Sequence, residues 1–225
     1  MKNYVREVYK TREAWLTCGR GIGGSTAAAI VGLSPWLSKL ELYNTMIGNT
    51  PRKPDTDSPV LAFGRAMEPL IRKQFALDHP EYKIRAPRGF EMYRRKDVPV
   101  LTATVDGLLT EIKTGRKGIW ECKTHDIRNK EDAAMWESNA LPPQYLIQVY
   151  HYLLVLNDCD FVDVTARQRY FRFDGESMNL DKVVTKTWHI EREDVEPTLL
   201  WLNNEELTFV EHLEYGIPPD GEIKF

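Results

Sequence analysis

The chain has few cysteines and no long apolar run. Its 225 residues include three cysteines, Cys18, Cys122 and Cys159, an odd number at distant positions. This usage argues against a disulfide framework and a four-cysteine metal cluster, and it predicts reduced thiols in the cytoplasm. We expect no membrane span and no secretory signal, because no apolar stretch is long enough for either and no basic segment precedes one.

An excess of positive charge is also missing. The formal net charge is −3, which makes a nucleic-acid partner less expected. A local basic rim beside an acidic site would reverse that expectation, although each such residue can equally be ordinary solvated surface. The candidates for the rim are Arg85, Arg88, Arg94, Arg95, Lys96, Lys113, Arg116 and Lys117.

Residues 101–124, LTATVDGLLTEIKTGRKGIWECKT, carry the most informative pattern. Side chains alternate along a strand, so a strand over 101–106 places Asp106 on a polar face. A strand over 119–124 places Glu121 and Lys123 on one shared face. The polar, glycine-rich residues 114–118 predict a hairpin turn between the two strands. If the strands pair, the two carboxylates and the lysine converge at one end of a sheet.

Two neighbouring carboxylates repel each other in a partly dry site unless a cation lies between them. Magnesium is a suitable cation because it takes oxygen ligands and keeps waters for substrate phosphates. A water activated by the metal, beside a lysine, can attack a phosphodiester. The alternative is a surface hairpin in which Lys123 screens Glu121 and Asp106 opens an Asp-Gly turn.

Glycines lead into an alanine-rich segment at residues 20–32, RGIGGSTAAAIVG. We expect a helix capped by Ser25, whose free backbone N–H groups would bind a phosphate at the positive end of the helix dipole. Arg20 could add a charge-assisted contact. The Walker spacing and its lysine are absent, and an ordinary junction between a loop and a helix is the alternative.

Three polar residues interrupt apolar helical patterns. Glu68 lies near the apolar stripe of a helix that begins at Ser58, and it is either a salt-bridged surface residue or a further carboxylate of the site. A strongly apolar helix over 144–156, introduced by Pro142-Pro143, contains Gln148 and His151. Gln148 could bond a nucleophilic water or a phosphate, or be a buried amide bonded to backbone. His151 is expected to be a core or boundary histidine with a hydrogen-bond partner.

The rest of the chain predicts a single domain with α/β content and no internal repeat. Residues 49–57 are expected to be a loop and residues 125–140 a polar, mixed segment. Expected helices cover 11–18, 38–48 and 195–213, and expected strands cover 161–170, 172–173 and 185–190.

A series of short motifs resembles the YqaJ-type viral recombinases, relatives of phage lambda exonuclease. The resemblance covers about residues 12–156, and its specificity comes from the order of the motifs. The motifs are RGIGGSTAAAIVGL at 20–33, SPW at 34–36 with the following LELY, GRAMEP at 64–69, VDG at 105–107, ECK at 121–123 and YLIQV at 145–149.

The resemblance implies a restriction endonuclease-like core, a mixed central β-sheet flanked by helices, with a PD-(D/E)xK metal site. It implies that Asp106, Glu121 and Lys123 are catalytic and that the backbone carbonyl of Cys122 is a metal ligand. Glu68 would serve the metal and Gln148 the catalytic centre. Ser25 and Arg20 would hold the 5′ phosphate of DNA.

The implied activity is Mg²⁺-dependent 5′-to-3′ exonuclease digestion of linear double-stranded DNA, with Mn²⁺ as a substitute. The implied partners are a single-strand annealing protein and further copies of the chain in a trimer, in the cytoplasm of a bacterium that carries the phage or prophage. One alternative is a nuclease of the same core that cuts internally, as a restriction or repair endonuclease does. Another is a DNA-end binding module without turnover.

Overall fold

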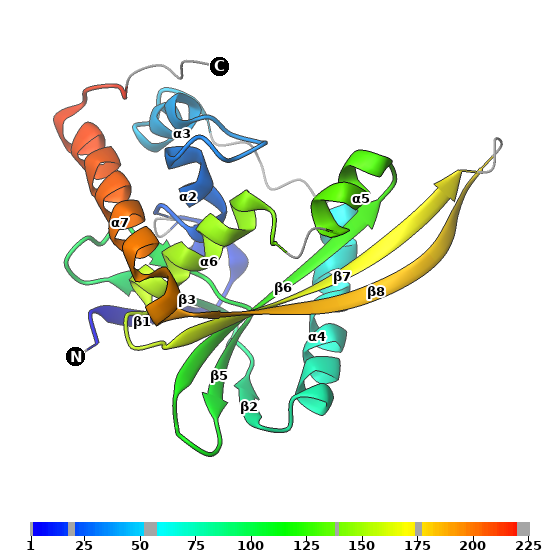
Figure 1. The fold of residues 1–225 in the computed structure, drawn as a ribbon. Helices are drawn as coiled ribbons and strands as arrows, with labels where there is room; N and C mark the ends of the chain where they lie inside the picture. The colour runs from blue at the N-terminus through cyan, green and yellow to red at the C-terminus, as the bar shows by residue number, and fades with distance from the viewer. Residues whose placement is uncertain (1, 18–20, 52–57, 138–139, 174–176, 220–225) are drawn as a thin grey trace.

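Helices cover both faces of a central sheet in this computed structural model (Figure 1). The structure describes residues 2–17, 21–51, 58–137, 140–173 and 177–219. In chain order the elements are β1 (Tyr4–Tyr9), α1 (Arg12–Thr17), α2 (Gly24–Ile30), α3 (Lys39–Met46), α4 (Pro59–Asp78), β2 (Tyr82–Arg85), β3 (Phe90–Arg95), β4 (Thr102–Ala103), β5 (Gly107–Glu111), β6 (Lys117–Ile127), α5 (Lys130–Glu137), α6 (Pro143–Val155), β7 (Phe161–Phe173), β8 (Met178–Glu191) and α7 (Arg192–Tyr215).

The larger sheet has the strand order β2-β5-β6-β7-β8, and a smaller sheet has the order β1-β3-β4. β6 and β7 are parallel, whereas the other neighbours in both sheets are antiparallel. The larger sheet is therefore mixed, which confirms the expected fold class. The C-terminal strands β7 and β8 join this same sheet.

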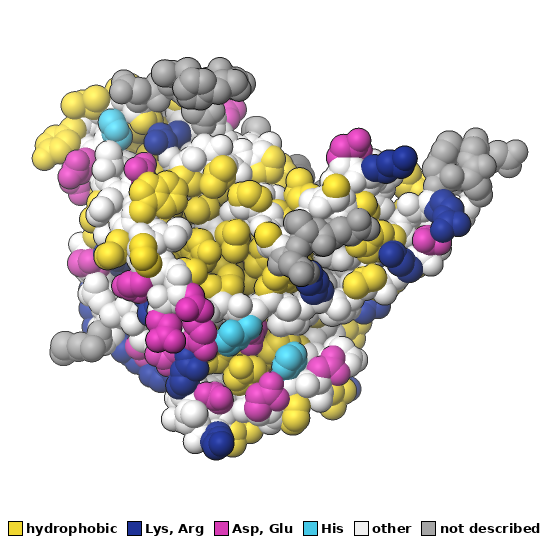
Figure 2. Space-filling model, viewed as in Figure 1, with side chains coloured by type: hydrophobic (Ala, Val, Ile, Leu, Met, Phe, Trp, Pro, Cys, Tyr) yellow, Lys and Arg dark blue, Asp and Glu magenta, His cyan; other side chains and the backbone are white. Residues whose placement is uncertain are grey.

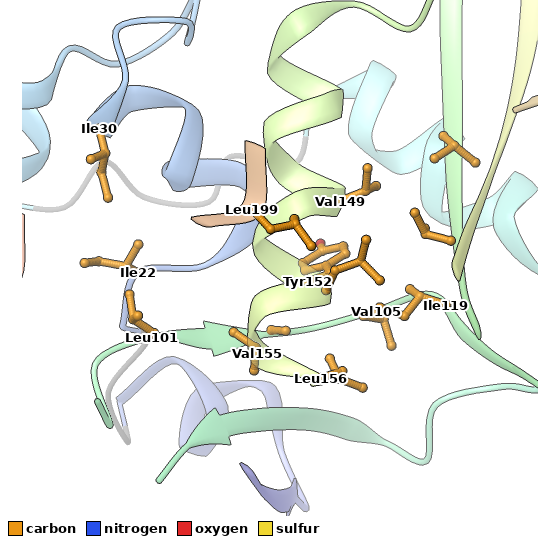
Figure 3. Packing of buried hydrophobic residues seen from close by; sticks show 14 of the residues in the cluster. Ile22, Ile30, Leu101, Val105, Ile119, Val149, Tyr152, Val155, Leu156 and Leu199 are labelled. Atoms are coloured by element: carbon orange, nitrogen blue, oxygen red, sulfur yellow. The ribbon is translucent and has the colours of Figure 1, made fainter. Parts of the chain in front are cut away.

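Alternation along β6 divides the core between the two faces of the sheet. Trp120 and Cys122 pack against Ile71 and Phe75 of α4. Ile119, on the other face, belongs to the main core with residues of α2, α6 and α7 (Figure 3). The face that carries Glu121 and Lys123 is therefore the face covered by α6.

The expected hairpin between strands 101–106 and 119–124 is wrong. Only Thr102–Ala103 forms a strand in the first segment, and it pairs with β3 in the smaller sheet. β6 pairs instead with β5, in the register Gly107↔Trp120. Asp106 thus lies where the chain passes from one sheet to the other. The reason is that β3 competes for the first segment, which buries Leu101 and Val105 in the core.

The sequence did not predict β1 and β3, because their charged residues make both segments look like polar loops. In the structure these charged residues pair across the two strands: Glu7 of β1 accepts a hydrogen bond from Arg94 of β3 at 3.0 Å. Residues 125–140 contain the end of β6 and α5, and β8 is longer than the expected strand over 185–190.

Helix boundaries agree well with the capping signals. Ser38 and Glu41 form the expected capping box, and Ser58 accepts a hydrogen bond from the Leu61 N–H at 3.2 Å. The tail helix is confirmed and longer than expected, from Arg192 to Tyr215. Of the expected loop over 49–57, residues 52–57 lie outside the described part of the chain.

Candidate active site

Asp106 and β6 meet through a hydrogen bond between a side chain and the backbone. The Cys122 N–H donates to Asp106 Oδ2 at 2.8 Å, and Asp106 is half-buried. Glu121 and Lys123 flank Cys122 on the opposite face of β6, since side chains alternate along the strand. The predicted acid, acid and lysine therefore come together, although Asp106 lies in the link between β4 and β5 and not on the expected strand.

Lys123 and Glu121 form the centre of a side-chain network. The Lys123 ammonium donates to Glu121 Oε1 at 2.7 Å and to Gln148 Oε1 at 2.8 Å. Gln148 in turn donates through Nε2 to Glu121 Oε1 and to the Tyr152 hydroxyl, both at 2.7 Å. The ring of Tyr145 lies 4.9 Å from the Lys123 ammonium. Gln148 is thus a buried amide whose partners are side chains of the site, and not backbone.

Tyr152 and Arg72 belong to the neighbourhood of the site, and sequence reasoning missed both. Tyr152 follows Gln148 by four residues, so helical spacing was a usable signal. Arg72 donates to Glu68 Oε1 at 2.9 Å and to the Asp106 backbone oxygen at 2.8 Å. Glu68 is therefore a salt-bridged helix residue whose partner also contacts Asp106. Its role toward a metal stays a prediction.

The charges of the site shift each other's protonation. Burial, and then the charges of Glu121 and Glu68, hold the pKa of Asp106 well above its usual range. Burial also raises the pKa of Glu121, although Lys123 opposes that shift. Burial works against the ammonium of Lys123, but Glu121 and Asp106 raise its pKa. The site is therefore a cluster of carboxylates in which Lys123 supplies the positive charge next to Glu121 and Arg72 the one next to Glu68.

The oxygen atoms present fit a hard divalent cation. Glu121 is 3% exposed, and its Oε2 atom is buried with no hydrogen-bond partner in the described structure. Such an atom is costly unless a cation meets it. The described residues contain no group of three or more Asp, Glu, His or Cys side chains already placed to hold a metal. Mg²⁺ needs only one or two carboxylates, because water and substrate phosphates complete its shell.

A cavity of about 790 Å³ contains the site and the glycine-rich segment. Its lining includes Ser25, Asp106, Glu121 and Gln148, so Ser25 faces the same space as the carboxylates. Arg20 lies outside the described residues.

The expected capping of α2 by Ser25 is wrong. Gly23 is the N-cap of α2, and Ser25 is the second residue of the helix. The reason is that Thr26 Oγ1 accepts a hydrogen bond from the Gly23 N–H at 3.0 Å and donates to the Gly23 carbonyl at 2.9 Å.

His151 is a core histidine, as expected. It is fully buried, and its ring nitrogens lie 2.6 Å from Glu206 Oε1 and 2.8 Å from the Thr102 backbone oxygen. Neither of these hydrogen bonds involves a carboxylate of the candidate active site.

The candidate basic rim is largely neutralised by carboxylates, which corrects the expectation of a cationic border. Glu91 is the main acceptor: burial raises its pKa, and hydrogen bonds from Arg85 and from Arg6 of β1 lower it below its usual range. The backbone N–H of Arg88 also donates to Glu91 at 3.0 Å, a contact that does not involve the Arg88 guanidinium. Besides Arg85, four members of the rim have carboxylate partners. These pairs are Arg94 with Glu7, Arg95 with Asp97, Arg116 with Glu191 and Lys117 with Asp158.

Comparisons with solved structures support the fold. An alkaline exonuclease from Laribacter hongkongensis superposes with a TM-score of 0.63 at 16% identity, covering 91% of this chain and 94% of that one. A structure of the same exonuclease in complex with dAMP superposes with a TM-score of 0.63 at 14% identity, covering 92% and 94%. At these identities the likeness concerns the fold.

Sequence comparisons identify the family. A Bacillus subtilis protein described as the uncharacterized protein YqaJ is 33% identical over 147 residues, which is 65% of this chain and 43% of the relative. The chain therefore matches less than half the length of that relative. No helix among the described residues is long and apolar enough to cross a membrane. Residues 14–160 match the YqaJ-like viral recombinase domain, and the chain belongs to that family.

Proposed function

We propose that this protein is a Mg²⁺-dependent exonuclease that digests one strand of linear double-stranded DNA from its 5′ end. The observation that carries the proposal is the buried Glu121 Oε2 atom, which has no hydrogen-bond partner in the described structure. Its carboxylate accepts a hydrogen bond from Lys123 through Oε1, and burial together with the charge of Glu121 raises the pKa of Asp106. The proposal is also supported by the family and by the fold shared with an alkaline exonuclease, which has been solved with dAMP.

Asp106, Glu121 and the backbone carbonyl of Cys122 would hold the metal, with Glu68 as a further carboxylate. When bound, Mg²⁺ supplies Lewis-acid activation of the phosphodiester and of a water. Lys123 would stabilise the charge that develops on the phosphoryl oxygens, since its ammonium is fixed by Glu121 and Gln148. Ser25 would donate its hydroxyl to the terminal 5′ phosphate from the wall of the same cavity.

The family description as a viral recombinase domain extends the proposal to recombination. Digestion from 5′ ends would leave 3′ overhangs for a single-strand annealing protein. We include in the proposal a homotrimeric assembly and a phage or prophage origin, with action in the bacterial cytoplasm and Mn²⁺ as a substitute metal.

The proposal is tested by nucleotide release from linear duplexes with and without a 5′ phosphate, and from a closed circle, in Mg²⁺. We expect release from linear ends only, with stimulation by the phosphate. Lys123→Ala should lower turnover by roughly 10²–10³-fold, because a donor to the developing charge is lost. Circular dichroism verifies that the variant is folded.

Each other outcome points to a different function. Cutting of the closed circle would indicate an endonuclease of the same core. Duplex binding without nucleotide release, in Mg²⁺ or Mn²⁺, would indicate a DNA-end binding module. Wild-type turnover in Lys123→Ala would remove that residue from the catalytic centre.

A further inference from the structure

Strands β7 and β8 continue past the end of β6 and project from the molecule (Figure 1). We define the ribbon as the outer part of these two strands, the described residues 167–172 and 178–186. β6 still pairs with residues 167–170, so only the part beyond Tyr170 is two-stranded. The described residues of the ribbon carry five cationic side chains and a single carboxylate, the sequence that joins the two strands adds Asp174 and Glu176, and the whole chain has a net charge of −3. Lys and Arg side chains lie along the ribbon in the space-filling view (Figure 2). The cations are Arg167, Arg169, Arg172, Lys182 and Lys186, and the carboxylate is Asp181.

The carboxylates near the ribbon neutralise its charge only in part. Asp126 is shared between Arg169, at 2.7 Å, and Arg128 of the adjoining loop, at 2.8 Å. Asp181 lies 3.1 Å from Arg172. Within the described residues, Arg167 and Lys182 have no carboxylate at ion-pair distance. These two cations therefore remain available to an anionic partner.

Two aromatic rings, one within the ribbon and one just beyond it on β8, hold the two lysines of the ribbon in place. The Lys182 ammonium lies 4.4 Å from the centre of the Tyr170 ring, and the Lys186 ammonium lies 4.8 Å from that of Trp188. Such contacts attract a cation without neutralising its charge.

The register of the sheet connects the ribbon to the candidate active site. Lys123 pairs with Ala166, and Ala166 pairs with Lys186, so the two lysines share one rung and one face of the sheet. Two strand spacings place their Cα atoms about 10 Å apart. Lys182 lies four residues further along β8 on that face, or about 13 Å. Positive charge thus extends outward from the site on the face that carries Lys123.

We propose that the ribbon binds the phosphate backbone of duplex DNA, on the part of the duplex that has not yet entered the site. The inference rests on the proposed function. Lys182 and Lys186 lie on β8, an edge strand of the larger sheet, so a duplex that lies along this edge can place its phosphates against both lysines. DNA carries about one charge per 1.7 Å of its axis, so a row of lysines of this length meets several phosphates. The contacts are to the backbone and carry no sequence preference.

The test is duplex binding by Lys182→Gln/Lys186→Gln. The matched control is Lys73→Gln/Lys83→Gln, which makes the same charge change at exposed positions on α4 and on the opposite edge strand β2. Fluorescence anisotropy with a labelled 30-base-pair duplex, without metal and over a salt series, measures affinity. We expect the ribbon variant to lose duplex affinity on the order of tenfold. The slope of the logarithm of its affinity against the logarithm of the salt concentration should fall in magnitude by about 2, whereas the affinity and slope of the control variant should equal those of wild type.

Kinetics and light scattering complete the test. If the ribbon acts only by binding, KM should rise while kcat at saturating DNA stays near wild type. Wild-type affinity and salt slope in the ribbon variant would overturn the proposal. The ribbon also exposes the apolar side chains of Met178, Leu180 and Val183, which could contact another copy of the chain. If light scattering shows that the ribbon variant loses its assembly and the weaker DNA binding only follows that loss, the proposal is also overturned. The anisotropy measurement needs no turnover. A protein without nuclease activity would therefore overturn the proposed function, but the DNA affinities of the ribbon and control variants could still be compared.

Discussion

Gly24 sets how closely α2 approaches α6 beneath the candidate site. A Cβ atom at this position would lie 2.5 Å from the Tyr152 ring and 2.8 Å from Gln148 Cγ. Both side chains are buried, so neither can move away freely. At the preceding Gly23 the nearest atom would be 3.7 Å away, which is an ordinary contact.

We therefore expect Gly24→Ala to lower the free energy of unfolding by about 1–3 kcal/mol, through overpacking. Gly23→Ala is the comparison: its new methyl group meets no close atom, so it should cost only the loss of the N-cap preference, about 1 kcal/mol. Urea unfolding followed by circular dichroism gives both values. Wild-type stability in Gly24→Ala would contradict the close approach of α2 to α6.

Gln148 is predicted to position Lys123 and Glu121 rather than to react. It bonds both side chains, and Tyr152 holds its amide. Loss of a residue that orients catalytic or metal-binding groups typically costs 10–100-fold in activity, so Gln148→Ala should lower kcat by about that factor. Steady-state nuclease kinetics is the measurement. Gln74→Ala, which removes an exposed glutamine of α4, is the control, and unchanged kcat in Gln148→Ala would exclude the positioning role.

At the scale of elements, the contact between α6 and α7 includes the buried pair His151 and Glu206. Burial opposes the charged imidazole, but the Glu206 carboxylate and the hydrogen bond to Thr102 outweigh it and raise the pKa of His151. Arg95 acts in the opposite direction. The pair therefore stabilises the folded chain fully below the unfolded pKa of about 6.5, and this contribution is lost as pH rises through the higher folded pKa.

We predict that Glu206→Gln flattens the dependence of stability on pH above about 6.5. Urea unfolding of wild type and variant at a series of pH values isolates the pair, because other titrating groups such as His189 are common to both proteins. A difference in unfolding free energy that stays constant with pH would show that His151 gains no proton affinity from Glu206.

At the scale of the whole molecule, a metal that binds only the folded chain must stabilise it. At a hundredfold excess over Kd this linkage is worth about 2.7 kcal/mol, which corresponds to roughly 5–10 °C in Tm for a chain of this size. We expect Mg²⁺ or Mn²⁺ to raise the Tm of wild type, and to leave that of Asp106→Asn/Glu121→Gln unchanged. Thermal unfolding at ionic strength matched with NaCl is the measurement. An equal response of both proteins would place the metal elsewhere.

The whole molecule also decides where positive charge is available. The arginines that were candidates for a rim mostly contact carboxylates, and Glu91 accepts hydrogen bonds from β1 and β2 as well as from its own strand. The projecting ribbon retains more cations than carboxylates. The net charge of the chain is therefore a poor guide to a nucleic-acid partner, because the local charge of each part of the surface depends on which charged side chains pair there.

The sequence by itself determined the helix caps at Ser38 and Ser58, the long helices α6 and α7, the mixed α/β class and the shared face of Glu121 and Lys123. These features depend on periods of two or 3.6 residues and on hydrogen bonds within a few residues, so a local window contains their cause. The order of the motifs likewise indicated the family without a structure.

Only the tertiary structure decided which strand pairs with β6, and that Arg72 and Tyr152 join the site. It also decided that most of the basic rim is paired and that Lys186 shares a rung with Lys123. Strand pairing and ion pairing join residues far apart in the chain, and many partners compete for each of them. The outcome depends on the packing of the whole core, which no single segment contains.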